Sequence, residues 1–260
     1  MRRFAIGDIH GCAKALRSVI EAIDPQREDE LVFLGDYVDR GPDSRDAIDQ
    51  IIDLQTRTQV VALRGNHEIM LMGVAMNGLD DSVWRANGGN STLASYGGSL
   101  SKIPSNHLVF FHELLPHYEI DDTIFVHASY DPDFAMFDQT EMMTYWTHLT
   151  APFPAPHMSG KRVIVGHTPQ PNGQVMDLGH LVCIDTYCFG YGYLTAFEIG
   201  GKSIIQADRH GHVKSSPILA FKSKILKMSK SCRNWITTVN AKKQNQASTA
   251  SDDSSSSSSD

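Results

Sequence analysis

The sequence predicts an α/β protein built on a parallel sheet. Three strand-turn-helix units follow one another between residues 4 and 76, and in each unit a short apolar strand stops at a polar turn that contains glycine. Strands that alternate with helices in this way pair in parallel through right-handed crossovers. An open α/β sheet binds its ligands at the carboxyl ends of its strands, so these polar turns mark the expected site.

The three units have strands and helices of ordinary length. The expected strands cover residues 4–6, 31–34 and 60–63, and the expected helices cover residues 16–23, 44–54 and 69–76. Each helix places apolar residues on one face, and we expect Ser44 and Asn66 to act as N-caps. The turns after the strands contain Gly7-Asp8-Ile9-His10-Gly11, Gly35-Asp36-Tyr37-Val38-Asp39-Arg40-Gly41 and Arg64-Gly65-Asn66-His67-Glu68.

The remainder of the chain adds further strands and helices. Residues 80–101 are rich in Gly, Asn and Ser and should form loops with a short helix near 91–96, followed by a helix at 104–115. Strands at 123–126 and 162–165 end at His127 and His167, with a helical segment at 141–149 between them. The β patterns at 181–184, 194–199 and 203–206 favour a second sheet packed on the first.

The end of the chain differs in composition from the rest. We expect a catalytic domain over residues 1–221 and a tail over 222–260 that is first basic and then almost only Ser and Asp. Such a tail cannot bury enough apolar surface to fold, so we expect it to be disordered. Its basic part fits a solvated linker or a helix that binds a partner or a membrane surface, and its serines are open to phosphorylation.

Composition and charge exclude several classes of protein. A chain of 260 residues, 41% of them hydrophobic, can form one sizeable globular domain. The formal net charge of -7 argues against nucleic acid as a partner. Apolar runs are shorter than the roughly 18 to 20 residues that cross a bilayer, and the first strand directly follows Arg3, which leaves no room for a signal peptide. We therefore expect a cytoplasmic protein without stable membrane insertion, and its four cysteines form no zinc-binding pattern.

Five expected strands end in side chains that can bind a divalent cation. These residues are Asp8 with His10, Asp36, Asn66, His127 and His167. One carboxylate after a strand usually caps a helix, and a single histidine usually bonds to a neighbour, but five such endings at one sheet edge indicate a metal site. The set contains no thiolate, which favours manganese, iron or zinc. Two such ions can together hold the attacking and leaving oxygens of a phosphoryl group.

The polar turns also carry a family resemblance. Gly7–Gly11, Gly35–Gly41 and Gly65–Glu68 resemble the three signature motifs of the phosphoprotein phosphatases within the calcineurin-like metallophosphoesterases. Val126-His127-Ala128 and Gly166-His167-Thr168 are similar to the segments that carry the family's remaining metal histidines. The resemblance covers about residues 3–208 and implies a four-layered α/β/β/α sandwich around a binuclear metal centre.

The resemblance implies a role for each matching residue. Two divalent ions, Mn²⁺ in first place with Fe or Zn as alternatives, would be held by Asp8 and His10 on one side, by Asn66, His127 and His167 on the other, and by Asp36 as the bridge. A metal-bound hydroxide would attack phosphorus in line, with the phosphate held by Arg40 and Asn66. His67, oriented by Asp39, would protonate the leaving oxygen.

The sequence departs from the family pattern near Trp146. Bacterial members often carry an arginine just after this tryptophan, which gives a second contact to phosphate, and the segment Tyr145–His148 has none. His148 is the nearest substitute for binding substrate, although it cannot form the bidentate contact of a guanidinium group. Arg85 and Arg162 are the alternatives that could reach into the site from elsewhere.

The function that these features favour is hydrolysis of phosphomonoesters, most specifically by a serine/threonine protein phosphatase. Asp39 and Glu68 support this choice, because the related symmetrical diadenosine tetraphosphate hydrolases usually lack the first and carry Asp in place of the second. The expected partners are a phosphorylated protein or a small phosphoester. The alternatives are the symmetrical hydrolase activity itself and a weakly active metal-binding scaffold with the same fold.

Overall fold

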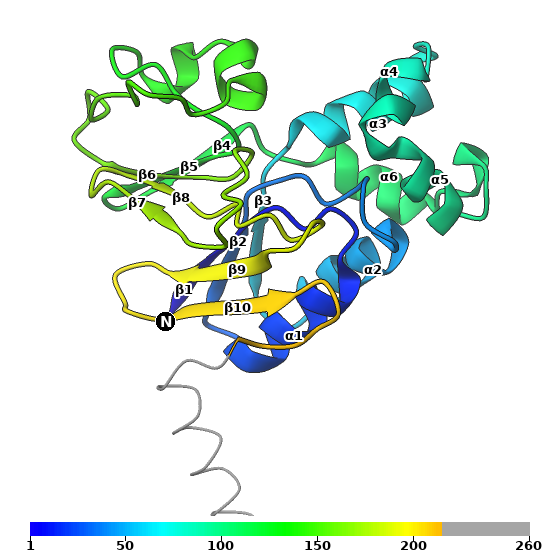
Figure 1. The fold of residues 1–260 in the computed structure, drawn as a ribbon, viewed down its shortest axis with the longest axis horizontal. Helices are drawn as coiled ribbons and strands as arrows, with labels where there is room; N and C mark the ends of the chain where they lie inside the picture. Colours follow the sequence, from blue (N-terminus) through cyan, green and yellow to red (C-terminus); the bar gives the residue numbers. More distant parts are fainter. Residues whose placement is uncertain (215–260) are drawn as a thin grey trace, which may run out of the picture. The chain divides into compact units, whose positions relative to one another are not determined.

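The structure is a computed structural model that describes residues 1–214, and within them two five-stranded mixed sheets face each other (Figure 1). The strand orders are β10-β9-β1-β2-β3 in the first sheet and β4-β5-β6-β8-β7 in the second. The first sheet consists of β1 (Arg3–Ile6), β2 (Glu30–Phe33), β3 (Gln59–Ala62), β9 (Tyr193–Glu198) and β10 (Ile204–Asp208). The second consists of β4 (His117–Ile120), β5 (Thr123–Val126), β6 (Arg162–Val165), β7 (Met176–Asp177) and β8 (Leu181–Cys183).

Helices follow the strands of the first sheet, as the strand-turn-helix pattern predicts. The α-helices are α1 (Ala13–Ile23), α2 (Ser44–Leu54), α3 (Asn66–Asn77), α4 (Ser82–Trp84), α5 (Asn90–Ser95) and α6 (Ser105–His112). α1 buries the stripe Leu16, Val19, Ile20 and Ile23, and it packs on β9, β10 and α2. This face shields the outer side of the first sheet from water, which is the main stabilising contribution of an amphipathic helix.

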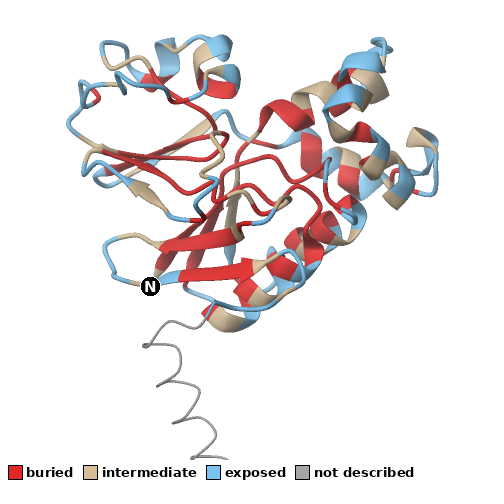
Figure 2. Ribbon diagram, in the orientation of Figure 1, coloured by how far each residue is buried: buried red, intermediate tan, exposed pale blue. Residues whose placement is uncertain are grey.

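Apolar side chains of both sheets meet in one core between them. This cluster includes Ala5, Val32 and Leu34 from the first sheet and Phe125, Ile164 and Val182 from the second. The other face of the second sheet packs against residues 130–149, which contain the short helical turns η3 (Met136–Asp138) and η4 (Met142–Trp146). Buried residues therefore concentrate in the strands and in the loops where the sheets meet (Figure 2). The predicted α/β sandwich is confirmed.

The sequence prediction was wrong about where the last strands pair. We expected the segments from 181 to 206 to form part of a second sheet, but only β8 does so, parallel to β6. β9 pairs antiparallel with β1, and β10 pairs with β9, which extends the first sheet. The pairing partner of a strand depends on contacts distant in sequence, which an apolar pattern does not encode. β4 and β7 were not predicted, because they are short and only partly buried.

Two predicted N-caps are also wrong, and both residues have other partners. The N-cap of α2 is Asp43, whose side chain accepts a hydrogen bond from the Asp46 amide, while the Ser44 hydroxyl accepts one from the Asp39 amide at 3.2 Å. Gly65 occupies the N-cap position of α3, and Asn66 is the first residue of the helix. The Asn66 side chain is thereby free to point into the loops at the strand ends.

The structure differs from the predicted helices in two further segments. Residues 80–101 contain more helix than expected: α4 and α5 are joined through η1 (Arg85–Gly89), with a kink at Gly88, and η2 (Leu100–Lys102) follows. The expected helix at 141–149 is reduced to the turn η4. The domain boundary at 221 and the tail at 222–260 lie outside the described residues. Within residues 1–214, the helices are all too short or too polar to cross a membrane.

The two sheets place their polar strand ends at one common edge. We expected five strands of a single sheet to converge there, but β1, β2 and β3 come from the first sheet and β5 and β6 from the second. The loops approach closely: a Cβ atom added to Gly35 would lie 2.7 Å from the Gly65 nitrogen and 2.9 Å from Nδ1 of His127. Gly35 also has φ of +102°, so only glycine fits this crossing of loops.

Candidate metal and phosphate site

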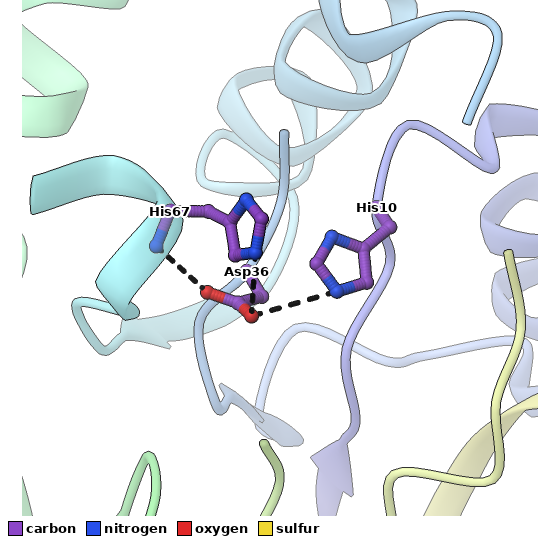
Figure 3. Close-up of side chains that lie close together, drawn as sticks. All are labelled: His10, Asp36 and His67. Carbon is purple, nitrogen blue, oxygen red and sulfur yellow. Dashed lines mark hydrogen bonds and ion pairs between the residues drawn. The ribbon is translucent and has the colours of Figure 1, made fainter. Parts of the chain in front are cut away.

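Asp36 lies at the centre of the site and faces histidines from both sheets. Its Oδ2 atom is 3.5 Å from Nε2 of His10 and 3.9 Å from Nε2 of His67 (Figure 3). Its Oδ1 atom is 3.4 Å from Nε2 of His127. Among the described residues, two groups have ligand atoms close enough to hold a cation, namely His10, Asp36 and His67, and Asp36, His127 and His167. Asp36 belongs to both groups, as a bridging carboxylate must.

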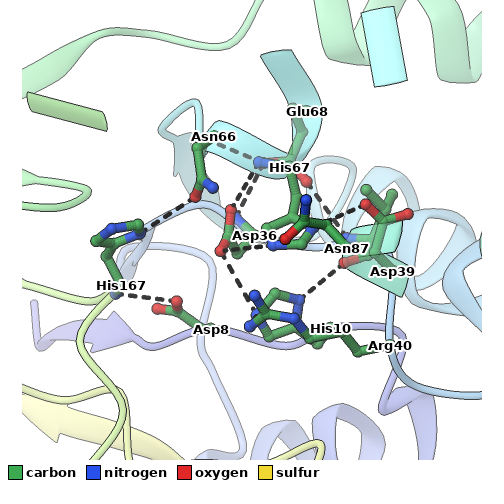
Figure 4. Close-up of polar contacts among 12 residues, drawn as sticks. Asp8, His10, Asp36, Asp39, Arg40, Asn66, His67, Glu68, Asn87 and His167 are labelled. Carbon is green, nitrogen blue, oxygen red and sulfur yellow. Dashed lines mark hydrogen bonds and ion pairs between the residues drawn. The ribbon is translucent and has the colours of Figure 1, made fainter. Parts of the chain in front are cut away.

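Asn66 and Asp8 complete the cluster. The Asn66 side-chain oxygen is 3.1 Å from Nε2 of His127 and 3.2 Å from Nδ1 of His167. Asp8 accepts a hydrogen bond from the His167 amide at 2.9 Å through Oδ2 (Figure 4). The structure therefore brings together all six residues that the sequence singled out as metal ligands, and each is nine-tenths or more buried.

The backbone fixes the orientation of two imidazole rings. Nδ1 of His10 lies 2.9 Å from the Val38 carbonyl oxygen, and Nδ1 of His127 lies 2.8 Å from the Leu34 carbonyl oxygen. A carbonyl oxygen only accepts, so each Nδ1 donates its proton and, in the neutral ring, Nε2 carries the lone pair. This is the tautomer that a metal-binding histidine needs, and Nε2 faces Asp36 in both residues.

The backbone at the site is held in conformations that side chains seldom adopt. His10, Asp36 and His167 have φ of +46°, +51° and +59°, and Asp39 and Arg40 have +70° and +68°. Positive φ at residues other than glycine costs of order 1 kcal/mol or more each and persists only where surrounding contacts impose it. Such strain concentrated at strand ends is typical of functional sites.

The electrostatics and hydrogen bonding fit a bound cation. Burial, with the charges of Asp185 and Asp36, raises the pKa of Asp8 well above its usual value. Burial, with His127 nearby, lowers the pKa of His167 to about 3. Buried polar atoms without a hydrogen-bond partner include Asp8 Oδ1, His167 Nε2 and Asp185 Oδ2. Carboxylates that repel one another beside neutral imidazoles form a donor set that a divalent cation fits.

His67 and Asp39 form a buried pair beside this cluster. Nδ1 of His67 lies 2.7 Å from Asp39 Oδ2. Burial lowers the pKa of His67, but the charges of Asp36 and Asp39 outweigh it, so the pKa is raised overall. Nε2 of His67 has no hydrogen-bond partner, although the ring is fully buried at 0% exposure. The ring therefore offers a nitrogen to a ligand at the site while its other nitrogen is fixed.

Two residues that sequence reasoning missed hold Asp39 in place. Trp84 Nε1 donates to both carboxylate oxygens at 3.0 Å, and the Thr92 hydroxyl donates to Oδ1 at 2.6 Å. Both come from the helical turns after α3, a region that the sequence presented as loops rich in Gly, Asn and Ser. Trp84 and Tyr96 are the two aromatic residues of that region, and they could have indicated an anchored segment.

Arg40 is the accessible cation of the site. The residue is exposed, and its Nη1 lies 2.9 Å from Nε2 of His10. Its guanidinium group lies over the ring of Phe189, 4.6 Å from the ring centroid, and its amide donates to the Gly88 carbonyl at 3.3 Å. These contacts hold a planar donor at the opening of the cluster, where it can bind a phosphate oxygen.

The three residues predicted to replace a second arginine differ in where they lie and in what they contact. His148 is exposed and stacks on His167, with ring centroids 4.3 Å apart, so it lies at the edge of the site. Arg162 does not approach the site, because it begins β6 whereas His167 follows the end of that strand, and it pairs with Asp177 at 2.7 Å. Arg85 pairs with Asp81 one helical turn away at 2.6 Å. The expectation that Arg162 reaches into the site is wrong for this structure, whereas for Arg85, which also contacts Asn90, it stays a prediction.

Glu68 organises the loop that carries Asp36. Its two carboxylate oxygens accept hydrogen bonds from the backbone amides of Asp36, Tyr37 and Gly65 at 2.9, 2.8 and 3.0 Å, and from Val38 at 3.3 Å. Burial and the charge of Asp36 raise its pKa, while the amides of Tyr37 and Gly65 that donate to it favour the charged carboxylate. The sequence identified Glu68 as part of a motif and as a residue that favours a protein phosphatase, and its bonding role required the structure.

The comparisons with known proteins agree with this geometry. A sequence model described as calcineurin-like phosphoesterase matches residues 1–193. A symmetrical bis(5'-nucleosyl)-tetraphosphatase of Legionella pneumophila is 39% identical over 79 residues, which are 30% of this chain and 28% of that protein. Serine/threonine-protein phosphatase 1 of Salmonella typhimurium is 37% identical over 89 residues, which are 34% of this chain and 38% of that protein. The matches thus span roughly a quarter to two fifths of these curated relatives.

A solved structure extends the comparison to most of the described chain. A cold-active protein tyrosine phosphatase superposes with a TM-score of 0.60 over 82% of this chain and 78% of its own, at 15% identity. At that identity the likeness concerns the fold alone.

Proposed function

Because the chain belongs to the calcineurin-like phosphoesterase family, we propose that it is a metal-dependent phosphomonoesterase of the serine/threonine protein phosphatase type. Phosphate would bind where Arg40 and the Asp36 cluster converge. The leaving group would face His67. The proposal goes beyond the general phosphoester hydrolase activity of the family by naming an alkyl phosphate as the substrate.

The observation that carries this proposal is the pairing of His67 with Asp39. An alkoxide, such as the side chain of serine, is a poor leaving group and needs a proton in the transition state. His67 has its Nδ1 fixed 2.7 Å from Asp39, and the charges of Asp36 and Asp39 raise its pKa, which favours the protonated ring whose Nε2 can donate. A phosphatase acting on alkyl phosphates requires such an acid.

The other residues have roles that follow from their contacts. Asp8, His10 and Asp36 would hold one divalent ion, and Asp36, Asn66, His127 and His167 would hold the second, with Mn²⁺ as the proposed metal. When bound, such ions lower the pKa of water and neutralise phosphate charge. Arg40 would bind and orient the phosphate from the open side, supported by Phe189 and the Gly88 carbonyl. His148, stacked on His167, would add a weaker contact at the rim.

A second candidate activity, hydrolysis of a dinucleoside tetraphosphate, is favoured by a row of aromatic rings. From His10 the row runs through Phe189 at 4.9 Å and Tyr187 at 4.7 Å to Tyr191 at 5.0 Å between centroids. Tyr191 is 76% exposed. Aromatic rings leading from a phosphate site to solvent offer stacking to a nucleobase, which contributes about 1 to 3 kcal/mol per base in other systems.

Competing substrates distinguish the two activities. The metal-stripped protein, reloaded with Mn²⁺, is assayed on a phosphoserine peptide, p-nitrophenyl phosphate and diadenosine tetraphosphate, with Asp8→Asn as the inactive control. The proposal predicts the highest kcat/KM for the peptide among biological substrates. It also predicts that His67→Asn reduces peptide turnover far more than p-nitrophenyl phosphate turnover, because nitrophenolate leaves without a proton. A higher kcat/KM for the dinucleotide than for the peptide, together with an increase in the KM for the dinucleotide in Tyr191→Ala, would replace the first candidate with the second.

A further inference from the structure

A sixth polar strand end lies beside the metal cluster. Asp185 comes two residues after β8, the strand next to β6 in the second sheet. The residue before it, Ile184, contacts the residue before Asp8: a Cβ atom on Gly7 would lie 2.6 Å from the Ile184 carbonyl oxygen. The ends of β1 and β8 therefore lie side by side across the two sheets, and each delivers a carboxylate at the same level.

The Asp185 carboxylate is buried and half of it has no partner. The residue is 2% exposed, and Oδ1 accepts a hydrogen bond from the Tyr187 amide at 3.0 Å. Oδ2 has no hydrogen-bond partner, and within residues 1–214 no lysine, arginine or histidine pairs with Asp185. Leaving a buried carboxylate without a partner is costly unless a cation compensates it.

Cations are few around Asp185. Arg40 is the one arginine or lysine whose charge acts on both Asp8 and Asp185 among the described residues, and its guanidinium is engaged with His10 and Phe189. Together with Asp36, three carboxylates face one arginine, which cannot balance them.

The turn after Asp185 holds the residue firmly. The Gln170 amide donates to the Asp185 carbonyl at 2.8 Å, and the Tyr193 amide donates to the Thr186 carbonyl at 2.9 Å. Tyr187 is kept at φ of +66°, which brings its amide back to Asp185 Oδ1. The free oxygen is thus fixed in position, as a ligand atom should be.

We infer that Asp185 is a further carboxylate ligand of the divalent cation held by Asp8, His10 and Asp36. The inference rests on the proposed metal-dependent function and gives the first metal position three carboxylates and one imidazole, while the second has one carboxylate, one amide and two imidazoles. A hard cation is bound more tightly by oxygen donors, so the two positions differ in metal preference. Asp185 should therefore make the first position less favourable to Zn²⁺, relative to Mn²⁺, than the second.

Metal binding tests the inference without any assay of activity. The full-length protein is freed of metal, titrated with MnCl₂ by calorimetry and melted with and without Mn²⁺. Asp185→Asn keeps the shape of the side chain and should weaken Mn²⁺ binding at one of the two positions by about 10- to 100-fold. It should also reduce the rise in Tm that Mn²⁺ causes, while the Tm of the metal-free protein stays equal or increases, because a buried repulsion is removed.

Control variants make each outcome decisive. Asp8→Asn should reproduce the loss at the same position, and Asp177→Asn, at a carboxylate on the distant strand β7, should leave Mn²⁺ binding unchanged. If Asp185→Asn does not fold, Asp185→Ser retains an acceptor for the Tyr187 amide and should show the same loss. Unchanged Mn²⁺ affinity together with a lower metal-free Tm would overturn the inference, since a purely structural carboxylate behaves that way. Failure to hydrolyse phosphoserine would leave this result standing.

Discussion

Asp39 and His67 lie 28 residues apart in sequence, yet Oδ2 of Asp39 lies 2.7 Å from Nδ1 of His67 in a fully buried pair. Trp84 and Thr92 donate hydrogen bonds to the same carboxylate from the opposite side. The carboxylate therefore cannot rotate away from the imidazole. The pair therefore fixes the position of His67, and the charge of Asp39 favours its protonated form.

Asp39→Asn should reduce kcat/KM for a phosphoserine peptide by about 10²- to 10⁴-fold, the range for loss of general acid catalysis. The charge of Asp39 helps to raise the pKa of His67, so the variant should also lower that pKa. Since the protonated imidazole is the active form, the fall of activity at high pH should move to lower pH. A pH profile of kcat/KM checks this, with p-nitrophenyl phosphate as the substrate whose turnover changes least.

The pH profile separates loss of the acid's charged partner from a disturbance of the fold as the cause of lower activity in Asp39→Asn. A purely structural loss would scale activity down at all pH values and would affect both substrates equally. That result would contradict the assigned role of the pair.

Glu68→Gln should destabilise the protein strongly. The carboxylate accepts hydrogen bonds from the amides of Asp36, Tyr37, Val38 and Gly65, and the amide of glutamine would turn an NH₂ group toward some of these donors. Leaving buried donors unpaired costs about 1 to 3 kcal/mol each, so we expect a loss of about 2 to 4 kcal/mol in the free energy of unfolding. Urea denaturation measures it, with Glu21→Gln on the exposed face of α1 as the control. A loss no larger than that of the control would contradict this role of Glu68.

Gly166→Ala should weaken metal binding while the protein still folds. A Cβ atom at Gly166 would overlap Oδ1 of Asp8, so the ligand must move. Gly73→Ala is the matched control. Gly73 lies within helix α3, and a Cβ atom there would meet only the flexible end of the Leu79 side chain. Calorimetric titration with Mn²⁺ should show lower affinity for Gly166→Ala alone. Equal affinity in the two variants would mean that Asp8 does not hold the metal where we place it.

Asp29 provides a pH test away from the site. Burial raises its pKa, but hydrogen bonds from the side chain and amide of Arg2 and the amide of Gln26 outweigh it, so the pKa is lowered to about 2. A carboxylate with a lowered folded-state pKa stabilises the fold above its unfolded pKa of about 4 and loses this contribution as pH falls toward 2.

A variant that lacks the Asp29 carboxylate should be less stable than the natural protein only at pH values where that carboxylate is charged. Asp29→Asn should reduce the free energy of unfolding by about 2 kcal/mol at pH 7 and by progressively less below pH ~4. Urea denaturation at several pH values measures this difference. A difference between the variant and the natural protein that does not change with pH would show that the ion pair is not its cause.

The sequence could predict much of the site because the relevant residues are encoded locally. An apolar strand directly precedes each of Asp8, Asp36, His127 and His167. In an α/β fold, the carboxyl ends of parallel strands lie at a common edge, so these residues come together. The same rule applied to Leu181–Ile184 identifies Asp185, which was not among the predicted ligands.

Other features depend on contacts that no local pattern encodes. Trp84 and Thr92 reach Asp39 across 45 and 53 residues, and β9 pairs with β1 from the far end of the domain. Asn66 resembles an N-cap in sequence, but its side chain contacts His127 and His167 instead. A preference that is worth about 1 kcal/mol for a cap is easily outweighed by tertiary contacts. Residues with two plausible local roles are therefore the ones that require a structure.

The most direct test of the central claim is the number of Mn²⁺ ions bound per chain, measured by mass spectrometry of the metal content after equilibration, in the natural protein and in Asp36→Asn. Because Asp36 faces His10 and His127 with different oxygens, we predict two ions per chain in the natural protein and weakened binding at both positions in the variant. Retention of one full-affinity ion in Asp36→Asn, or a natural protein that binds a single ion, would contradict a centre bridged by this carboxylate.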